Sequence, residues 1–461
     1  MTIALLTDGF YPFTMGGIQK HSYYLAKYWA RQGIAVHVYH PNPYKAEVLN
    51  EHFTAEELER IHFVYVQHPQ SIKFPGHYIY NSYRYSKALY KKVGNQKYDA
   101  IYAQGFTGWY FVKNQEDINL VTNLHGLNMF QASVNIKHKI QLLLLRIPAK
   151  PIILKSHKQI SLGGKLTDIL YKQGAQPNSV FEVPNAIAGE WIDFSPVSNA
   201  KPDKVKNLNK KRDYVKINKT RRFIFIGRYE RLKGIEEINQ VVEQLVQEGH
   251  RNFQIDFVGP IPENKRLDLG DNEKGIGYRA KDIGHREKDI GHREKDIGDS
   301  VKANTGNSNS HNPQPKPQTL NPKPYNPQPK PHNLNPIIYH GSITSQQTIQ
   351  TLLHESDILL CPSYSEGMPT VILEAMACGC AIIATDVGAS GELVNDQNGW
   401  LIKGNIANDL VSGLKNAMRQ ALSIEESSLQ QMKEASMHKV KEKYTWDVVA
   451  RQSLEVVRLI G

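Results

Sequence analysis

The sequence has few cysteines and no long apolar run, and each absence excludes a class of protein. Only three of its 461 residues are cysteines, namely Cys361, Cys378 and Cys380, which excludes the disulfide framework of a small secreted domain. Cys378 and Cys380 flank a single glycine, and two ligands alone do not make a zinc site. We therefore expect free thiols, buried in a protein of the reducing cytoplasm.

The apolar residues are likewise dispersed along the chain. The densest apolar patch, residues 142–145, is far too short to cross a bilayer. The first residues lack the basic start and the apolar stretch of a secretory signal, which also predicts a cytoplasmic protein. The net charge of +11 indicates attraction to anions such as nucleotide phosphates, nucleic acid or an acidic membrane surface.

Much of this charge lies in one stretch of the chain. Residues 201–222 contain ten lysines and arginines against two aspartates, which is a local charge of +8. We interpret residues 196–222 as a solvated basic linker between two domains, and a membrane-docking patch is the alternative.

On both sides of the linker, the apolar segments follow the order of a doubly wound α/β domain. Residues 3–6 form a short apolar run without alternation, as in a strand buried on both faces. A glycine break, a helical pattern over 18–32 and a second apolar run over 34–39 follow, which is the order of a βαβ unit. Further strands are expected at 98–103, 120–124, 179–183, 223–227, 253–259, 337–340, 358–361 and 381–385, with a helix over 234–247. The predicted organisation is an N-terminal domain over 1–195, a C-terminal domain over 223–445 and a closing helix over 446–461.

The C-terminal domain contains an insertion. Residues 281–298 repeat the unit KDIGHRE, whose single isoleucine per seven residues cannot build a coiled coil. Residues 312–336 are dense in proline, which removes backbone donors and favours extended chain. We interpret residues 265–335 as a disordered insertion in a surface loop, with a partner-docking arm as the alternative.

A pair of glutamates carries the sharpest chemical signal, in residues 365–379, SEGMPTVILEAMACG. A predicted strand precedes them, Pro369 suits a first helical turn and Gly379 suits a helix end. Glu366 is therefore expected in the loop at the carboxyl end of a strand, and Glu374 in the helix that follows. Ligands of doubly wound sheets bind at this edge, where a helix N-terminus attracts phosphate and a carboxylate can accept hydrogen bonds from a ribose diol. An isolated pair of this kind would indicate only charge on a helix surface.

This stretch resembles the E-x7-E signature of glycosyltransferase family 4, the retaining transferases of GT-B fold, and the likeness covers most of the chain outside the linker and the insertion. Residues 226–234, IGRYERLKG, are similar to the family's G-R-x4-K-G segment. The resemblance implies two Rossmann-like α/β domains facing each other across a cleft. It also implies that Arg228 and Lys233 neutralise the diphosphate of a sugar donor, since two fixed cations can stabilise the leaving group without a metal.

The N-terminal half contains two further matches. Residues 13–21 resemble the family's glycine loop, so that Gly16 and Gly17 would close over the donor phosphates, because glycine has no Cβ. A structural turn is the alternative. His125, in the sequence NLHG, stands where the family carries a histidine that points at the donor sugar, and a core histidine is the alternative.

Two other segments depart slightly from the family pattern. Residues 183–187 resemble the V-P-N-G-hydrophobic signature, with Ala186 in place of glycine. Residues 386–392 resemble the loop that holds the donor phosphate and base, with Ala389 where glycine is common. The residue at such a position keeps its backbone contacts only if its φ stays negative.

The resemblance implies two sets of site residues. The catalytic set is Glu366, His125, Arg228 and Lys233. The donor-binding set is Gly16, Gly17, Gly367, Met368, Pro369, Thr370, Glu374, Gly388 and Glu392.

The sequence also lacks the Asp-x-Asp motif with which a metal-dependent transferase holds magnesium. The resemblance implies a reaction without metal or other cofactor, in which the acceptor attacks the face from which the nucleotide leaves and the departing phosphate takes the acceptor proton. A nucleotide-sugar epimerase of the same architecture and a non-catalytic sugar-nucleotide binder are the alternatives.

The donor nucleotide (UDP or GDP) and the acceptor (a lipid or a growing polysaccharide) stay open, and no nucleic-acid partner is expected. Residues 137–146 combine leucines with flanking cations. Peripheral contact with an anionic membrane and a helix that packs its leucines into the N-terminal domain explain this pattern equally well.

Overall fold

The computed structural model of the chain describes residues 1–194, 220–269 and 336–459, apart from 45, 71–73, 75, 95, 115–117, 134, 268, 405 and the side chain of 407. Most of the predicted basic linker (196–222) and of the predicted insertion (265–335) lies outside the described residues. Both interpretations therefore stay predictions, as do the proposed domain boundaries.

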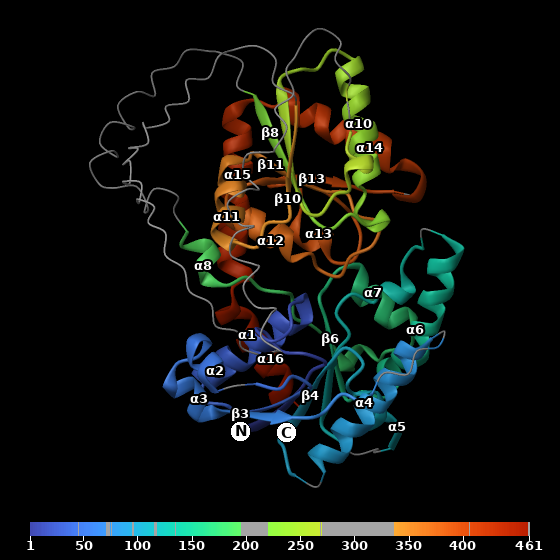
Figure 1. The fold of residues 1–461 in the computed structure, drawn as a ribbon, viewed down its shortest axis with the longest axis vertical. Helices are drawn as coiled ribbons and strands as arrows, with labels where there is room; N and C mark the ends of the chain where they lie inside the picture. Colours follow the sequence, from blue (N-terminus) through green and yellow to red (C-terminus); the bar gives the residue numbers. More distant parts are fainter. Residues whose placement is uncertain are drawn as a thin grey trace, which may run out of the picture.

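The N-terminal unit, the lower half of the molecule in Figure 1, is built on a parallel seven-stranded sheet. The order of its strands is β3-β2-β1-β4-β5-β6-β7. Its strands are β1 (Thr2–Leu6), β2 (Ala35–His40), β3 (Ile61–Tyr65), β4 (Ala100–Gln104), β5 (Leu120–Asn123), β6 (Lys158–Ser161) and β7 (Val180–Glu182). Residues Ile3, Leu5 and Leu6 of β1 are fully buried. This burial on both faces explains why the strand reads as a continuous apolar run.

The helices of this unit connect successive parallel strands. They are α1 (Gly17–Arg31), α2 (Ala46–His52), α3 (Ala55–Arg60), α4 (His77–Val93), α5 (Trp109–Asn114), α6 (Ile136–Lys155), α7 (Lys165–Lys172) and α8 (Gly189–Ile192), with short 3₁₀ turns η1 (Asn128–Phe130) and η2 (Pro177–Ser179). Among the described residues, no helix is long and apolar enough to span a membrane.

The C-terminal unit repeats this plan with a parallel six-stranded sheet in the order β10-β9-β8-β11-β12-β13. Its strands are β8 (Arg221–Ile226), β9 (Phe253–Val258), β10 (Ile337–Gly341), β11 (Ile358–Cys361), β12 (Ala381–Thr385) and β13 (Gly399–Ile402). Its helical elements are η4 (Arg231–Lys233), α10 (Ile235–Gln247), η5 (Glu263–Lys265), α11 (Gln346–Glu355), α12 (Thr370–Ala377), α13 (Ser390–Leu393), α14 (Ile406–Ser423) and α15 (Glu426–Lys443).

The last helix, α16 (Trp446–Arg458), returns to the N-terminal unit and packs against α1 (Figure 1). The indole N–H of Trp29 in α1 donates to the backbone oxygen of Ala450, and it lies 3.0 Å from Oγ of Ser453. The ring of Trp446 stacks on that of Tyr24, with centroids 5.2 Å apart. One apolar core therefore runs from the N-terminal sheet through α16 to α12 of the C-terminal unit.

The sequence pattern located every interior strand except β6, and the edge strands β7 and β10, within two residues. It missed β3, β6 and β13, of which β3 and β13 are sheet edges. Strands β3 and β6 contain polar residues, so they do not appear as apolar runs, and β13 has only three apolar residues after its glycine. Helix α12 begins at Thr370, so Pro369 precedes its first turn.

Candidate functional site

Three loops of the C-terminal unit meet at one edge of its sheet. Strands β8, β11 and β12 are neighbours and run parallel, so the loops that follow them all leave from the carboxyl edge. These loops carry Lys233, Glu366 and Gly388 respectively. Ligands of doubly wound sheets bind at this edge, and the structure thus brings together residues from three separate predicted motifs.

Lys233 and Glu366 are in direct contact. Nζ of Lys233 lies 2.7 Å from Oε1 of Glu366, and both side chains are largely buried. Burial opposes the charge on Lys233, yet the carboxylate of Glu366 and its hydrogen bond hold the pKa of the ammonium above its usual value. The site therefore contains a fixed cation beside a carboxylate.

Glu374 lies in the second turn of α12, as predicted from the spacing of the two glutamates. Burial raises the pKa of its carboxyl group to about 7, and the nearby Lys20 of α1 partly offsets this effect. Lys20 belongs to the first turn of the helix that begins at the glycine loop. Glu374 is therefore placed where a small change of environment decides whether it is ionised at neutral pH.

Close backbone approach explains two predicted glycines. Gly388 has a φ of +57°, and a Cβ there would collide with the backbone oxygens of Glu366 and Gly367. A Cβ on Gly367 would lie 3.0 Å from Cα of Gly126, in the loop that follows β5. The Glu366 loop is thus packed between the Gly388 loop and the N-terminal unit, with no room for side chains at these positions.

On the N-terminal side, His125 follows β5 in a strained loop with a φ of +59°. Its backbone N–H donates to Oδ1 of Asn123 (2.9 Å), and its Nε2 lies 2.6 Å from Oε1 of Gln104. Burial lowers the pKa of His125 to about 4, so the imidazole is neutral at pH 7. His21 packs edge-on against it, with ring centroids 5.0 Å apart.

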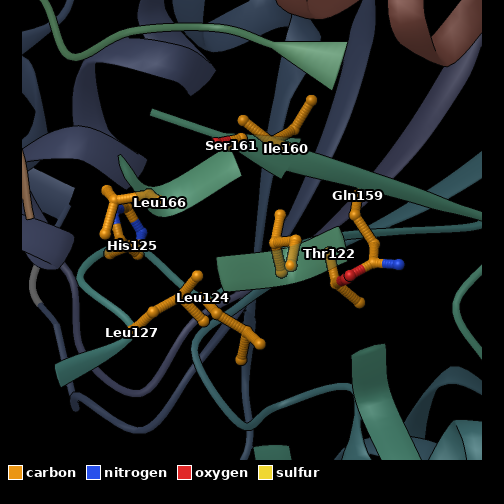
Figure 2. Close-up of a pocket in the computed structure, with 9 residues that line it drawn as sticks. Thr122, Leu124, His125, Leu127, Gln159, Ile160, Ser161 and Leu166 are labelled. Carbon is orange, nitrogen blue, oxygen red and sulfur yellow. The ribbon is translucent and has the colours of Figure 1, made fainter. Parts of the chain in front are cut away.

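A small cavity lies between the ends of β5 and β6 and the start of α7, with His125 in its wall (Figure 2). Figure 2 shows His125, Leu127 and Leu166 on one side, and Thr122 and Gln159 farther along the strands. The cavity has room for about one water molecule. It is too small for a sugar ring.

Gln131, Asn185 and Lys165 are three residues of the N-terminal unit whose side chains bond to the C-terminal unit. Nε2 of Gln131 donates to the backbone oxygens of Gly126 (2.6 Å) and Glu366 (2.7 Å), and its Oε1 accepts from Ser365 (2.9 Å). Nδ2 of Asn185 donates to the backbone oxygen of Met368 at 2.8 Å.

The third contact is an ion pair between the two units. Nζ of Lys165 lies 2.9 Å from Oδ2 of Asp386. Together with the contacts of Gln131 and Asn185, this pair closes the N-terminal unit against the loops that carry Glu366 and Gly388.

The structure does not bring Arg228 into the contact between Lys233 and Glu366. The side chain of Arg228 is 76% exposed and its guanidinium lies 3.1 Å from Glu230. Gly16 and Gly17 stand at the start of α1, and exposed Glu392 lies beside Gly163 of the N-terminal unit. The roles of these four, like those of all the other predicted site residues, stay predictions.

No sequence pattern marked Gln131 or Lys165, and Asn185 stood out only as part of a motif. A single glutamine or lysine in a loop gives no pattern from which a contact with a distant segment can be predicted. Asn185 is different, because its place in the stretch 183–187 could have marked it as a residue at the cleft.

No three His, Cys, Asp or Glu side chains of the described ranges gather as they would around a metal ion. The expectation of a metal-free reaction stays a prediction.

Two family models match separate stretches of the chain. The model described as Glycosyltransferase Family 4 matches residues 15–188, and the model described as Glycosyl transferases group 1 matches residues 321–422. The first stretch contains His125, and the second contains Glu366 and Glu374.

Curated relatives match short stretches only. D-inositol 3-phosphate glycosyltransferase of Rhodococcus erythropolis is 34% identical over 104 residues, 22% of each chain. The putative teichuronic acid biosynthesis glycosyltransferase TuaC of Bacillus subtilis is 39% identical over 77 residues, 17% of this chain and 20% of the relative. The chain thus spans about a fifth of the length of these two relatives.

Solved structures match over the whole chain at low identity. Sucrose-phosphate synthase from Thermosynechococcus elongatus has a TM-score of 0.65 and 16% identity, and the match covers 100% of this chain and 98% of that one. HepE of Anabaena, solved with UDP and glucose, has a TM-score of 0.57 at 14% identity and full coverage of both chains.

WaaG, a glycosyltransferase involved in lipopolysaccharide biosynthesis, also has a TM-score of 0.57, with 14% identity and full coverage of both chains. The two parallel sheets and these matches confirm the predicted fold. The chain therefore has the GT-B fold, with a stretch similar to glycosyltransferase family 4 in its N-terminal unit and a stretch similar to glycosyl transferases group 1 in its C-terminal unit.

Proposed function

We propose that the chain is a retaining glycosyltransferase, which moves a hexosyl unit from a nucleotide diphosphate sugar to a hydroxyl of a glycan or lipid acceptor. The observation that carries this proposal is the contact between Lys233 and Glu366 at the carboxyl edge of the C-terminal sheet. Gln131 joins the same loop to the one that carries His125. A cation, a carboxylate and a neutral imidazole thus belong to loops that meet at the cleft.

The donor diphosphate would bind where positive charge is concentrated. The start of α12 has no side-chain cap, and the helix dipole favours an anion there. Lys233 supplies a buried ammonium nearby, which stabilises the charge that develops as the sugar bond breaks. Arg228, on the same loop, is exposed and would have to move from Glu230 to take part.

Glu374 would hold the ribose of the donor, since a carboxylate accepts hydrogen bonds from neighbouring hydroxyls. Glu366 and His125 would orient the sugar ring, with His125 neutral because its pKa lies near 4. The acceptor oxygen attacks the anomeric carbon from the face that the nucleotide leaves. The bond to the β-phosphate oxygen breaks, and that phosphate takes the acceptor proton. This reaction needs neither a metal nor a protein base.

The contacts that join the two units favour a reaction in a closed cleft. Gln131, Asn185 and Lys165 each bond to the opposite unit around the Glu366 loop. Such closure excludes water, which would otherwise compete with the acceptor hydroxyl. We place the activity in the cytoplasm, since all three cysteines are free and buried.

A thermal-shift series with UDP, GDP and their sugars tests donor binding, because a ligand that binds only the folded state raises the melting temperature. HepE was solved with UDP and glucose, so UDP and UDP-glucose are the first ligands to examine. The identified donor is then assayed for turnover with and without candidate acceptors. No shift with any nucleotide sugar would count against the proposal.

The same assay separates the alternatives. An epimerase would convert the donor without any acceptor, whereas a binding protein would raise its melting temperature but turn over nothing. Both matched family models describe glycosyl transferases, which favours transfer over epimerisation.

A further inference from the structure

Helix α6 carries a stripe of large apolar side chains that nothing in the described chain covers. Ile136, Ile140, Leu143, Ile147 and Leu154 are 75%, 55%, 47%, 54% and 56% exposed. They are spaced so that a helix of about 3.6 residues per turn brings all five to one side. Leu142 is buried, so part of the leucine run packs inward as one reading of the sequence predicted. We call the five exposed residues the α6 stripe.

Lysines flank the α6 stripe on both sides. By the same helical periodicity, Lys139 and Lys150 lie along one border of the stripe, and Lys137 and Lys155 along the other. All four are exposed. An apolar stripe between two rows of lysines is the pattern of a helix that lies in the plane of an anionic membrane surface.

Helices α4 and α6 themselves contain no acidic side chain. The sequence has no Asp or Glu between residues 118 and 167, nor between 60 and 98, which includes all of α4. Helices α4 and α6 pack together on one flank of the N-terminal unit (Figure 1), where the hydroxyl of Tyr78 donates to the backbone oxygen of Gln141. Lys87, Lys91 and Lys92 of α4 are exposed.

Exposed aromatic rings occur at the beginning of α4. The side chains of Phe74 and Tyr80 are both more than a third exposed, and a Cβ on Gly76 would lie 3.8 Å from Leu144 of α6. Aromatic side chains of this kind favour the headgroup region of a bilayer. Helices α4 and α6 and the segment before α4 therefore offer aliphatic, aromatic and cationic groups, and neither helix contains a carboxylate.

We propose that the α6 stripe and its flanking lysines dock the protein on an anionic lipid bilayer. A bilayer supplies both parts of the complementary surface, namely acyl chains for the isoleucines and leucines and phosphate headgroups for the lysines. In a symmetric dimer formed through this helix, the lysines of one copy would face the lysines of the other, and their like charges would repel.

Docking through α6 would bring the cleft close to the membrane. Asn135 caps the first turn of α6 by accepting from the N–H of His138, and Gln131, which bonds to the Glu366 loop, stands only a few residues earlier in the chain. If the proposed transferase function holds, an acceptor anchored in the same bilayer reaches the cleft without leaving the membrane. The docking itself does not depend on that function.

Co-sedimentation of the full chain with lipid vesicles tests the docking. We expect the wild-type protein to sediment with vesicles that contain phosphatidylglycerol, and to stay in solution with phosphatidylcholine alone. The variant K139E/K150E should weaken binding at least about tenfold, because each lysine near an anionic surface contributes about 1 kcal/mol. The variant I140S/L143S should weaken it similarly, since its serines cannot enter the acyl region.

Matched controls separate a local effect from a change in total charge or apolarity. The variant K441E/K443E makes the same charge change on exposed residues of α15, and I338S removes an exposed isoleucine of β10. Both should bind vesicles like the wild type. The proposal would be overturned if the controls lost as much vesicle binding as the α6 variants, or if the wild type bound both lipids equally. It would also be overturned if the wild type were a dimer that I140S/L143S converts to a monomer.

Nucleotide binding without vesicles distinguishes this proposal from the proposed function. The variant K139E/K150E should keep the thermal shift with the nucleotide that stabilises the wild type, because neither lysine touches the cleft residues described above. A wild-type protein that binds vesicles but no nucleotide would contradict the transferase function alone.

Discussion

Nζ of Lys233 and Oε1 of Glu366 lie 2.7 Å apart at the carboxyl edge of the C-terminal sheet, on loops that follow the adjacent strands β8 and β11. The pair explains how a lysine can remain charged in a largely buried position before any ligand binds, because its carboxylate partner offsets the cost of desolvation. A bound diphosphate would compete with Glu366 for the same ammonium. Donor binding and the state of this ion pair are therefore expected to be coupled.

Replacement of either partner tests this coupling. Lys233→Met should lower turnover at least about a hundredfold, the loss typical of one removed electrostatic stabiliser. It should also destabilise the fold by about 1–3 kcal/mol, because Glu366 loses its partner. Glu366→Gln should lower turnover while UDP affinity is kept or increased, since the competing negative charge is gone.

Transfer assays, calorimetric titration with UDP and denaturant unfolding provide the measurements. Lys92→Met serves as a control, because Lys92 is exposed on α4 of the N-terminal unit, outside the site loops. Near-normal turnover in Lys233→Met would contradict the assigned role of this lysine.

Gln131 is predicted to hold the Glu366 loop in place from the opposite unit. Its amide bonds to backbone oxygens of both loops, and each lost hydrogen bond costs about 1 kcal/mol. Gln131→Ala should therefore lower kcat/KM roughly five- to thirtyfold, with little effect on the melting temperature. Gln131→Glu should be worse, because a carboxylate would face two backbone oxygens.

Steady-state kinetics with donor and acceptor measure this effect. The matched control is Gln397→Ala, at an exposed turn. If Gln131→Ala and Gln397→Ala have the same kinetics, the contact across the cleft does not position the loop.

Glu374 predicts a pH dependence of donor binding. Burial raises the pKa of its carboxyl group to about 7, and the ionised form is the one that accepts hydrogen bonds at both oxygens. Donor affinity should therefore rise with pH up to about 7, by roughly tenfold per pH unit in the region where the group is mostly protonated, and then level off. Titrations from pH 5.5 to 8.5 measure it, and Glu374→Gln should give a flat profile. If donor affinity in Glu374→Gln changed with pH as it does in the wild type, another group would be responsible for the effect.

The same raised pKa affects stability in the empty protein. Between the ordinary value of 4.5 and about 7, the folded state holds the proton and the unfolded state does not. The contribution of Glu374 to the free energy of unfolding is therefore present at low pH and is lost as the pH rises through that window. The loss is about 3 kcal/mol at most. Denaturant unfolding should show this loss in the wild type relative to Glu374→Gln.

The three cysteines should resist alkylation in the folded protein. All are buried, and burial raises the pKa of Cys361 and Cys380 to about 12 each. Since the thiolate is the reactive form, iodoacetamide at pH 8 should label them only after denaturation. Mass spectrometry of native and unfolded samples gives the count of modified thiols. Rapid labelling of the native protein would show that these side chains are accessible.

The sequence by itself determined the two α/β units, the central strands and the motifs around Lys233, Glu366 and Glu374. Central strands of a parallel sheet are buried on both faces, so they appear as apolar runs that need no knowledge of their neighbours. Glycines beside such runs mark the loops at the carboxyl edge, as at residues 365–379. These signals are local, and local signals can be recognised along a single chain.

Only the tertiary structure decided which groups meet across the cleft. Gln131 bonds to a loop more than two hundred residues away, and Lys165 pairs with Asp386, yet neither residue type nor spacing marks such a partner in advance. The pairing of Lys233 with Glu366 and the outward position of Arg228 likewise depend on how β8 and β11 lie side by side. The sequence also left undecided which side of α6 is exposed, because its leucine run fits both a buried helix and a helix at a surface. The packing of α4 and α5 against α6 shows which side is covered.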